Sequence, residues 1–291
     1  MYVVFGANGR AGGETARALM DRGAPVRVVL RRAEQAAAWQ ARGAEVAIAS
    51  IDDATEVAAA LEGASGAFLL NPPPVVGDPY VRTQEIGTAL AEGARRAGLP
   101  KAVVLSSVGA QHASGTGVIA TLNQLETLLD GAATATAFLR PGYFVETWSE
   151  VAPAAIAEGV LPTFVEPSHR FPMVSTVDVG RAAAQILYED WTGQRVVELG
   201  GPEDWNAADV AGAFANALGR AVVPAFIPAE QRESVRAAEG IPSEVATALL
   251  GMYDGIASGQ VTYERGQELR RGVFPLISAV KRIVSAAQKT A

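Results

Sequence analysis

The chain has 291 residues, enough for one large core or a core plus a small lobe, and 49% of them are hydrophobic, which predicts a packed globule. The formal net charge is −7 and no basic cluster is present, so neither nucleic acid nor an anionic membrane surface is expected as a partner. Cysteine is absent, only two histidines exist and no carboxylate cluster has a convincing ligand spacing, which excludes disulfides, a thiol nucleophile and a His-rich or Cys-based metal site.

The first half of the chain alternates between apolar runs and helical patterns. Strands are predicted at 2–5, 26–30, 45–49, 66–70, 102–106 and 134–139, and helices at about 12–21, 33–42, 54–62, 80–97 and 118–129. This alternation is typical of an α/β fold, a doubly wound parallel sheet of the Rossmann type with helices on both faces. Ligands of such sheets bind beyond the carboxyl ends of the strands, so the segments after the strands are the candidate sites.

A glycine-rich turn follows the first predicted strand, with the spacing GxxGxxG in place of GxGxxG. Glycines allow a sharp turn and a close approach of the backbone to a ligand, and a helix N-terminus offers N–H groups to a pyrophosphate. An ordinary turn between a strand and a helix is the alternative, but the position favours dinucleotide binding. A side chain at Gly9 is expected to occupy ligand space or to force an unfavourable φ. The residues expected to contact the cofactor here are Gly6, Asn8, Gly9, Arg10, Ala11 and Gly12.

The second predicted strand ends in Arg31 and Arg32, where an NAD site usually has an acidic residue for the ribose 2′-hydroxyl. A guanidinium at this point suits a 2′-phosphate, through charge-assisted hydrogen bonds. A solvated charged loop is the alternative, and it fits Arg32 well. Arg31 follows the strand directly, so the sequence predicts NADP(H) in preference to NAD(H).

The segments after the next four strands supply the remaining cofactor candidates. Asp52 is expected to accept from the adenine amino group; the alternative is that this segment only begins a helix, with Asp53 as its N-cap. The proline-stiffened loop after residue 70 is expected to line the cofactor groove or to be a rigid connection. The contacts predicted from these later segments are Asn71, Pro72, Pro73, Ser106, Ser107, Pro141, Tyr143 and Phe144.

The second half of the chain is less regular. We predict a short strand at 171–175, a helix at 177–187 and a strand at 195–199, followed by helices at 206–218, 229–238, 242–257 and 275–287. These last helices would form a small, mostly helical C-terminal lobe. The predicted domains are therefore a cofactor-binding core over 1–199 and a substrate lobe over 200–291, interleaved with the core. Leu276, Val280, Ile283 and Ala287 share one helix face, which either packs on its own domain or forms a homodimer contact.

Apolar residues lead from Met1 directly into the glycine turn, so no signal peptide is expected, and no apolar run approaches the ~18–20 residues of a membrane span. By elimination, a cytoplasmic protein is expected.

The chain resembles the NmrA-like branch of the atypical short-chain dehydrogenase/reductase superfamily. The resemblance spans roughly residues 2–185 and rests on the order of several stretches: 6–12, Arg31, 105–110, 125–129, 139–146 and 177–180. It implies a Rossmann core, a small C-terminal substrate lobe and NADP(H) binding. The family includes quinone and azo-dye reductases, and also transcriptional co-regulators that bind the cofactor without turnover.

Carbonyl reductases of the wider superfamily use a Tyr and a Lys that are four residues apart. The sequence departs from this pattern, because none of its six tyrosines is followed by Lys four residues later. Reduction of a simple ketone makes an alkoxide that needs a positioned acid. Reduction of a quinone makes a phenolate-like anion, with a basicity near that of Tyr at pKa about 10, for which water or one hydrogen bond suffices. The predicted activity is therefore NADPH-dependent hydride transfer, without flavin, to a small apolar or aromatic acceptor such as a quinone or an azo dye. The alternative is a non-catalytic NADP(H)-binding sensor.

Three residues are candidates for the chemistry at the acceptor. His112 lies in a glycine-rich loop expected to overhang the nicotinamide, where it would donate a proton or remain an exposed loop residue. Asn123 would hydrogen-bond the acceptor or cover a helix surface. Tyr143, with Phe144, would form the acceptor wall or plain core.

Overall fold

A computed structural model describes residues 1–73, 75–238 and 240–290, and its centre is an eight-stranded sheet in which every pairing is parallel. The strand order is β12-β10-β6-β5-β4-β1-β2-β3, so the order reverses between β1 and β4. This is the Rossmann-type arrangement predicted from the sequence, with β10 and β12 added beyond β6. The strands are β1 Tyr2–Phe5, β2 Val26–Leu30, β3 Glu45–Ile48, β4 Gly66–Leu70, β5 Lys101–Leu105, β6 Ala135–Pro141, β10 Gly193–Gly200 and β12 Glu268–Arg271.

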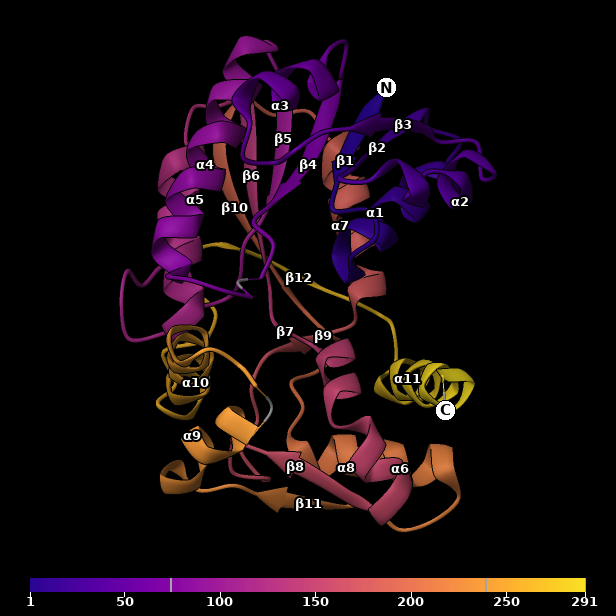
Figure 1. Cartoon of the computed structure of the whole chain (residues 1–291), viewed down its shortest axis with the longest axis vertical. Helices are drawn as coiled ribbons and strands as arrows, with labels where there is room; N and C mark the ends of the chain where they lie inside the picture. The colour runs from indigo at the N-terminus through magenta and orange to yellow at the C-terminus, as the bar shows by residue number, and fades with distance from the viewer. Residues whose placement is uncertain (74, 239, 291) are drawn as a thin grey trace.

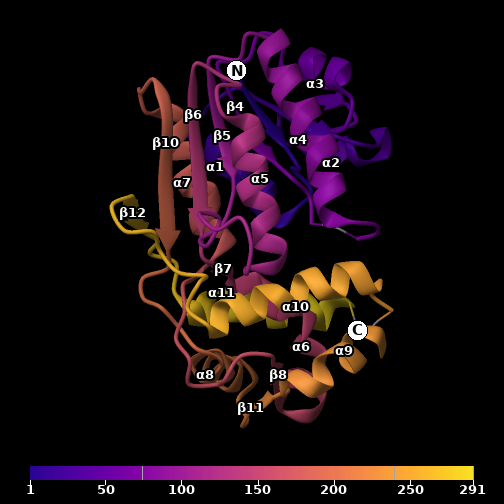
Figure 2. The ribbon, with the colours of Figure 1, turned by 90° about the vertical axis from the view of Figure 1, so that its left-hand side faces the viewer.

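Helices cover both faces of this sheet (Figures 1 and 2). One face carries α1 Arg10–Asp21 and α7 Thr176–Tyr188, and the other carries α3 Ala54–Leu61, α4 Pro79–Arg96 and α5 Ala120–Leu129. The central strands are apolar on both sides because each side packs against a separate helical layer: Val4 of β1 packs in the layer of α1 and α7, and Val3 packs in the layer of α3, α4 and α5. The helix predicted over about 33–42 forms only in part, as a 3₁₀ turn, Ala33–Gln35, followed by one α-helical turn, α2 Ala37–Gln40.

A second body lies below the carboxyl ends of the strands (Figure 1). Its helical elements are 3₁₀ helix η3 Val145–Glu150, α6 Ala152–Glu158, α8 Ala207–Leu218, α9 Ala229–Ala238, α10 Ser243–Ala257 and α11 Leu276–Thr290. It also holds two parallel two-stranded pairs: β8 Val160–Thr163 with β11 Val223–Phe226, and β7 Tyr143–Phe144 with β9 Met173–Val174. β9 lies within the short strand predicted at 171–175, whereas the elements of 145–163, β7 and β11 were not predicted. The boundary at 199/200 stays a prediction, although the core of this lobe draws on residues from both sides of it.

The last helix packs on its own lobe. Val280 and Ile283 of α11 are buried against α8, α6 and η3. This outcome agrees with the domain-packing alternative for the predicted apolar face of that helix. No helix among the described residues is both long and apolar enough to cross a membrane.

β12 is a short polar strand that an ion cluster fixes to the sheet. Glu189, at the end of α7, lies 2.6 Å from Arg195 of β10 and 2.9 Å from Arg270 of β12. Hydrogen bonds from these two arginines lower the pKa of Glu189 from 4.5 to about 2. The ionised carboxylate therefore holds β12 in place.

Replacing Glu189 by Gln is expected to lower the melting temperature at pH 7 by about 2–4 °C, the shift for a loss of about 1 kcal/mol in a chain of this size. A lowered pKa contributes stability that is complete above pH 4.5 and lost as the pH falls through about 2, so wild type and variant should converge over that range. Thermal unfolding across pH checks this. Glu92→Gln removes an exposed pair with Arg96 and is the control. An unchanged difference at pH 2.5 would contradict the prediction.

Candidate cofactor and acceptor site

The glycine turn after β1 is built by close packing between the turn, β4 and α1. Gly6 has φ +66°, and a Cβ there would lie 2.7 Å from Leu70 Cδ2. A Cβ at Gly12 would lie 2.3 Å from the Gly6 carbonyl oxygen and 2.7 Å from that of Phe5. Gly12 is therefore required for the contact between helix and strand. Gly9 is exposed with φ −86°, an ordinary value, so the expectation of an unfavourable φ there is wrong and only the ligand-space reason remains.

The N-terminus of α1 has no side-chain cap, whereas Asp53, Asp78, Ser175 and Asn206 cap α3, α4, α7 and α8. Its first-turn N–H groups and the positive end of the helix dipole are thus open to an anion.

Two side chains of the turn tie it to its surroundings. Asn8 Oδ1 accepts a hydrogen bond of 2.8 Å from Trp39 Nε1, which fixes the turn to α2. Arg10 donates to Thr147 Oγ1 and Ser149 Oγ, both at 3.2 Å, and so connects the turn to η3 of the lobe. Ala11 is buried in the core of the sheet.

The ends of β2 and β3 carry a free cation and a paired carboxylate. Arg31 is exposed and makes no hydrogen bond or ion pair within the described part of the chain, while Arg32 lies 3.8 Å from Glu34. Asp53 caps α3, as one alternative predicted. Asp52 accepts from Arg82 at 2.6 Å, and hydrogen bonds from Ser50 and Arg82 lower the pKa of its carboxyl.

The loop after β4 contains an unsatisfied polar atom. Asn71 Nδ2 donates to Thr83 Oγ1 at 2.8 Å, but the buried Asn71 Oδ1 has no partner among the described residues. A buried amide oxygen without a donor is rare and is suited to a ligand hydrogen. Pro72 and Pro73 are exposed beside it.

A buried charge network lies directly under the ends of β5 and β6. Glu126 of α5 accepts from Arg140 Nε at 2.8 Å and Nη2 at 2.6 Å, and from the Ser106 hydroxyl. Glu264 pairs with Arg140 Nη1, and its own N–H donates to Glu198 at 2.9 Å. Burial raises the pKa of Glu198. The Ser106 hydroxyl is therefore committed to Glu126, and its predicted contact with cofactor stays a prediction.

The loop that contains His112 packs against α10. A Cβ at Gly117, where φ is +54°, would lie 2.3 Å from the Met252 backbone nitrogen. Asn123 Nδ2 donates to the Ala110 carbonyl at 2.8 Å and so holds the loop to α5. The Ser107 hydroxyl donates to the Val108 carbonyl. His112 is half-buried, and its side chain has no polar partner in the described ranges.

The segment after β6 enters an aromatic group that spans sheet and lobe. Pro141 is buried and Phe144 packs against the core of the sheet. The Tyr143 ring lies 6.2 Å from Trp148 and 5.8 Å from Phe171, centroid to centroid. Its hydroxyl lies 3.3 Å from that of Tyr253 on α10. The structure thus places Tyr253, from the C-terminal part of the chain, beside Tyr143 of the predicted acceptor wall.

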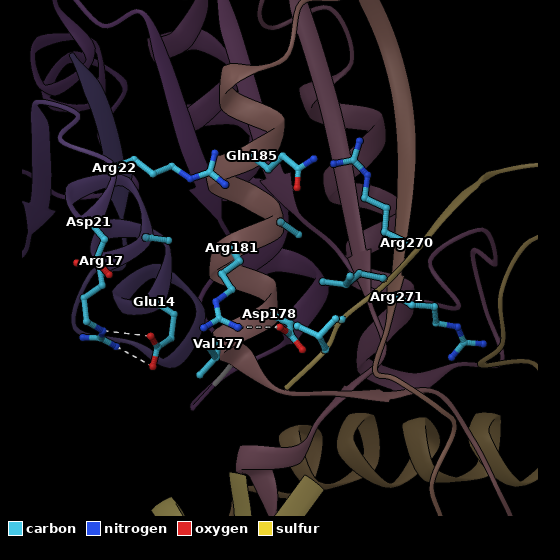
Figure 3. Close-up of a pocket in the computed structure, with 15 residues that line it drawn as sticks. Glu14, Arg17, Asp21, Arg22, Val177, Asp178, Arg181, Gln185, Arg270 and Arg271 are labelled. Carbon is cyan, nitrogen blue, oxygen red and sulfur yellow. Dashed lines mark hydrogen bonds and ion pairs between the residues drawn. The ribbon is translucent and has the colours of Figure 1, made fainter. Parts of the chain in front are cut away.

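A separate pocket of about 540 Å³ lies between α1, α7 and residues 270–273 (Figure 3). Charged side chains line it, among them Glu14, Arg17, Arg181 and Arg271, and Asp178 is paired with Arg181. None of the residues predicted from the sequence to bind cofactor or acceptor lines it. The described ranges contain no group of three or more His, Asp or Glu side chains placed to hold a metal ion.

Sequence reasoning missed Glu126, Arg140 and Tyr253 as parts of this region. Glu126 and Arg140 are single charges inside apolar core segments, and that pattern could have marked them as a buried pair. Tyr253 carries no such signal, because only the tertiary fold places α10 beside the end of β6.

Comparisons with known proteins agree with this architecture. The sequence model of the NmrA-like family matches residues 2–280. An NAD(P)H azoreductase from Xenophilus azovorans is 26% identical over 255 residues, 87% of this chain and 86% of that protein. The triphenylmethane reductase of Citrobacter sp. superposes with a TM-score of 0.81 at 20% identity, covering 98% of this chain and 99% of the other. An NADPH-dependent quinone oxidoreductase from Escherichia coli, in complex with NADPH, gives 0.75 at 21% identity over 97% and 99%.

Proposed function

The chain belongs to the NmrA-like family, and on that basis we propose that it is an NADP(H)-dependent reductase that transfers a hydride directly to a quinone-like or azo acceptor without flavin. One observation carries the proposal: the glycine turn and the uncapped N-terminus of α1 lie where the strand order of the parallel sheet reverses. Next to them is a lobe whose core contains several aromatic side chains. The azo, quinone and triphenylmethane reductases among its relatives support the reductase class.

The glycine turn and the residues that follow β2 and β4 fit a nicotinamide dinucleotide. The open N–H groups at the start of α1 suit a pyrophosphate, and the unpaired Asn71 Oδ1 suits a donor of the ligand. The exposed Arg31 suits a 2′-phosphate, which favours NADP(H) over NAD(H). When bound, NADPH supplies the hydride.

Arg31→Ala is expected to raise the Kd for NADPH by about 10- to 150-fold, the loss of one hydrogen bond to a charged group, and to leave the Kd for NADH nearly unchanged. Calorimetry of both cofactors measures this. Arg32→Ala is the matched control, because Arg32 is the neighbouring exposed arginine and already pairs with Glu34. Equal affinity of the wild type for NADPH and NADH would contradict the proposed preference.

The acceptor class follows from what the site lacks. No Tyr–x–x–x–Lys pair is present in the sequence, so the alkoxide formed from a ketone would lack the tyrosine and lysine pair that carbonyl reductases of the wider superfamily use. Hydride transfer to a quinone leaves a phenolate-like anion with a basicity near that of the Tyr side chain, for which water or one hydrogen bond suffices. Holding acceptor and nicotinamide together would supply most of the rate. His112, Asn123 and Tyr143 remain the proposed acceptor-side residues, with His112 as one candidate proton donor.

The test is NADPH oxidation by the flavin-free protein with quinones, azo dyes and simple ketones. We expect turnover of quinones or azo dyes and none of ketones. Rapid reduction of an unactivated ketone would overturn the acceptor class. Tight NADPH binding without turnover of any acceptor would replace the reductase by the non-catalytic sensor.

A further inference from the structure

Two tyrosine hydroxyls meet where the sheet joins the lobe. Tyr143 follows the end of β6 and Tyr253 lies on α10, and their oxygens are 3.3 Å apart. β6 is hydrogen-bonded to β5, the strand that leads to Ser106 and Ser107, so the pair lies beyond the carboxyl edge of the sheet. β7, which contains Tyr143, is the part of the lobe next to that edge (Figure 1).

Aromatic side chains surround the pair. Trp148, Phe164 and Phe171 are 6%, 8% and 5% exposed, whereas the two tyrosines are only half-buried. The three buried rings thus give the pair an apolar surrounding. The ring centroids of Phe164 and Tyr253 are 5.1 Å apart, so buried rings contact Tyr253 as well as Tyr143.

The hydrogen bonding of the pair leaves one proton unused. The two hydroxyls carry two protons, and one of these serves the bond between them. Among the described residues, no other acceptor is bonded to either hydroxyl. Burial raises the pKa of both phenols, which keeps them protonated at neutral pH, while the positive charge of Arg236 acts in the opposite direction on each. The pair therefore holds one O–H group ready to donate to a ligand.

We propose that the hydroxyl pair of Tyr143 and Tyr253 binds the oxygen or nitrogen of the acceptor and donates the proton that accompanies hydride transfer. This rests on the proposed function. The acceptor gains a hydride from NADPH and a proton from the pair; one tyrosine O–H bond breaks, one O–H or N–H bond forms on the product, and water returns the proton to the tyrosinate. The products are NADP⁺ and a hydroquinone or a hydrazo compound.

Activity is tested with Tyr253→Phe, Tyr143→Phe, the double variant and His112→Ala. For acceptors with strongly basic reduced anions, the Tyr253 change should lower kcat by about 10²-fold or more, the range for a lost general acid. For electron-poor quinones with weakly basic reduced anions, the loss should be slight. The double variant should be little worse than the poorer single variant, because the two hydroxyls act as a unit. Tyr188→Phe, an exposed tyrosine on α7, is the control.

A binding measurement separates this inference from the proposed function. 4-Nitrophenolate imitates a reduced quinone, and its absorption band reports hydrogen bonding. With NADP⁺ present, Tyr253→Phe should weaken its binding by about 10- to 150-fold. Tyrosine-dependent binding without any turnover would support the site and overturn the reductase. An equal loss for every acceptor, unchanged nitrophenolate binding, or a fall confined to His112→Ala would overturn the tyrosine pair while the reductase stands.

Discussion

Valine at position 9 should abolish NADPH binding and leave the fold intact. Gly9 is exposed at the N-cap of α1 with φ −86° and ψ 175°, values that any residue adopts. A Cβ there meets only the Gly6 carbonyl oxygen at 3.2 Å, so the larger part of a valine side chain would occupy the space over the open end of the helix. Displacing a pyrophosphate from these N–H groups removes several charge-assisted hydrogen bonds, which corresponds to a Kd increase of more than about 10²-fold.

The comparison that makes this prediction specific is with Gly12 and Gly212. Gly12→Val should lose both binding and stability, because its Cβ would collide with the backbone of Gly6 and Phe5. Gly212→Val should bind normally, since a Cβ on that face of α8 meets nothing within 4 Å. Calorimetry with NADPH, far-UV circular dichroism and melting temperature distinguish the three cases. Normal NADPH binding by Gly9→Val would reduce the motif to a turn.

The centre of the sheet was predictable because its strands are buried on both faces. Each of β1, β2 and β4 is a continuous apolar or nearly apolar run, and their predicted and observed bounds coincide at 2–5, 26–30 and 66–70. Parallel strands covered by helices need this composition, so the pattern is visible without tertiary information. The glycine turn was predictable for the same reason, since its position between strand and helix is local in the sequence.

The elements that were missed are held by distant partners. β12 reads Glu-Leu-Arg-Arg, which has no strand pattern, and it pairs because Arg270 reaches Glu189. The segment 145–163 is divided into three short elements whose core contacts lie in α8 and α11. The helix predicted at 33–42 is interrupted and short because most of this stretch is exposed, with Trp39 as its only buried residue, so little packing supports a longer helix.

The buried network under the candidate site should have the largest effect on stability. Glu126→Ala is expected to lower the free energy of unfolding by about 3–5 kcal/mol, because it leaves a buried charge without its main partner. Arg140 is 5% exposed, and Glu126, at 7%, binds it through both Nε and Nη2. The remaining partner, Glu264, is 34% exposed and binds a single guanidinium nitrogen. Urea unfolding followed by tryptophan fluorescence measures the change.

Two variants decide whether charge or space is responsible. Glu126→Gln keeps the volume and one accepting oxygen, so it should cost less than alanine but still more than about 1 kcal/mol, since Arg140 then keeps only Glu264 as a charged partner. Thr127→Ala alters the adjacent exposed residue of α5 and should stay within about 0.5 kcal/mol of wild type. Because the same carboxylate holds the Ser106 hydroxyl, Glu126→Gln should also weaken NADPH binding if Ser106 contacts the cofactor. A fully stable Glu126→Ala protein would show that Arg140 reaches solvent or Glu264 alone suffices.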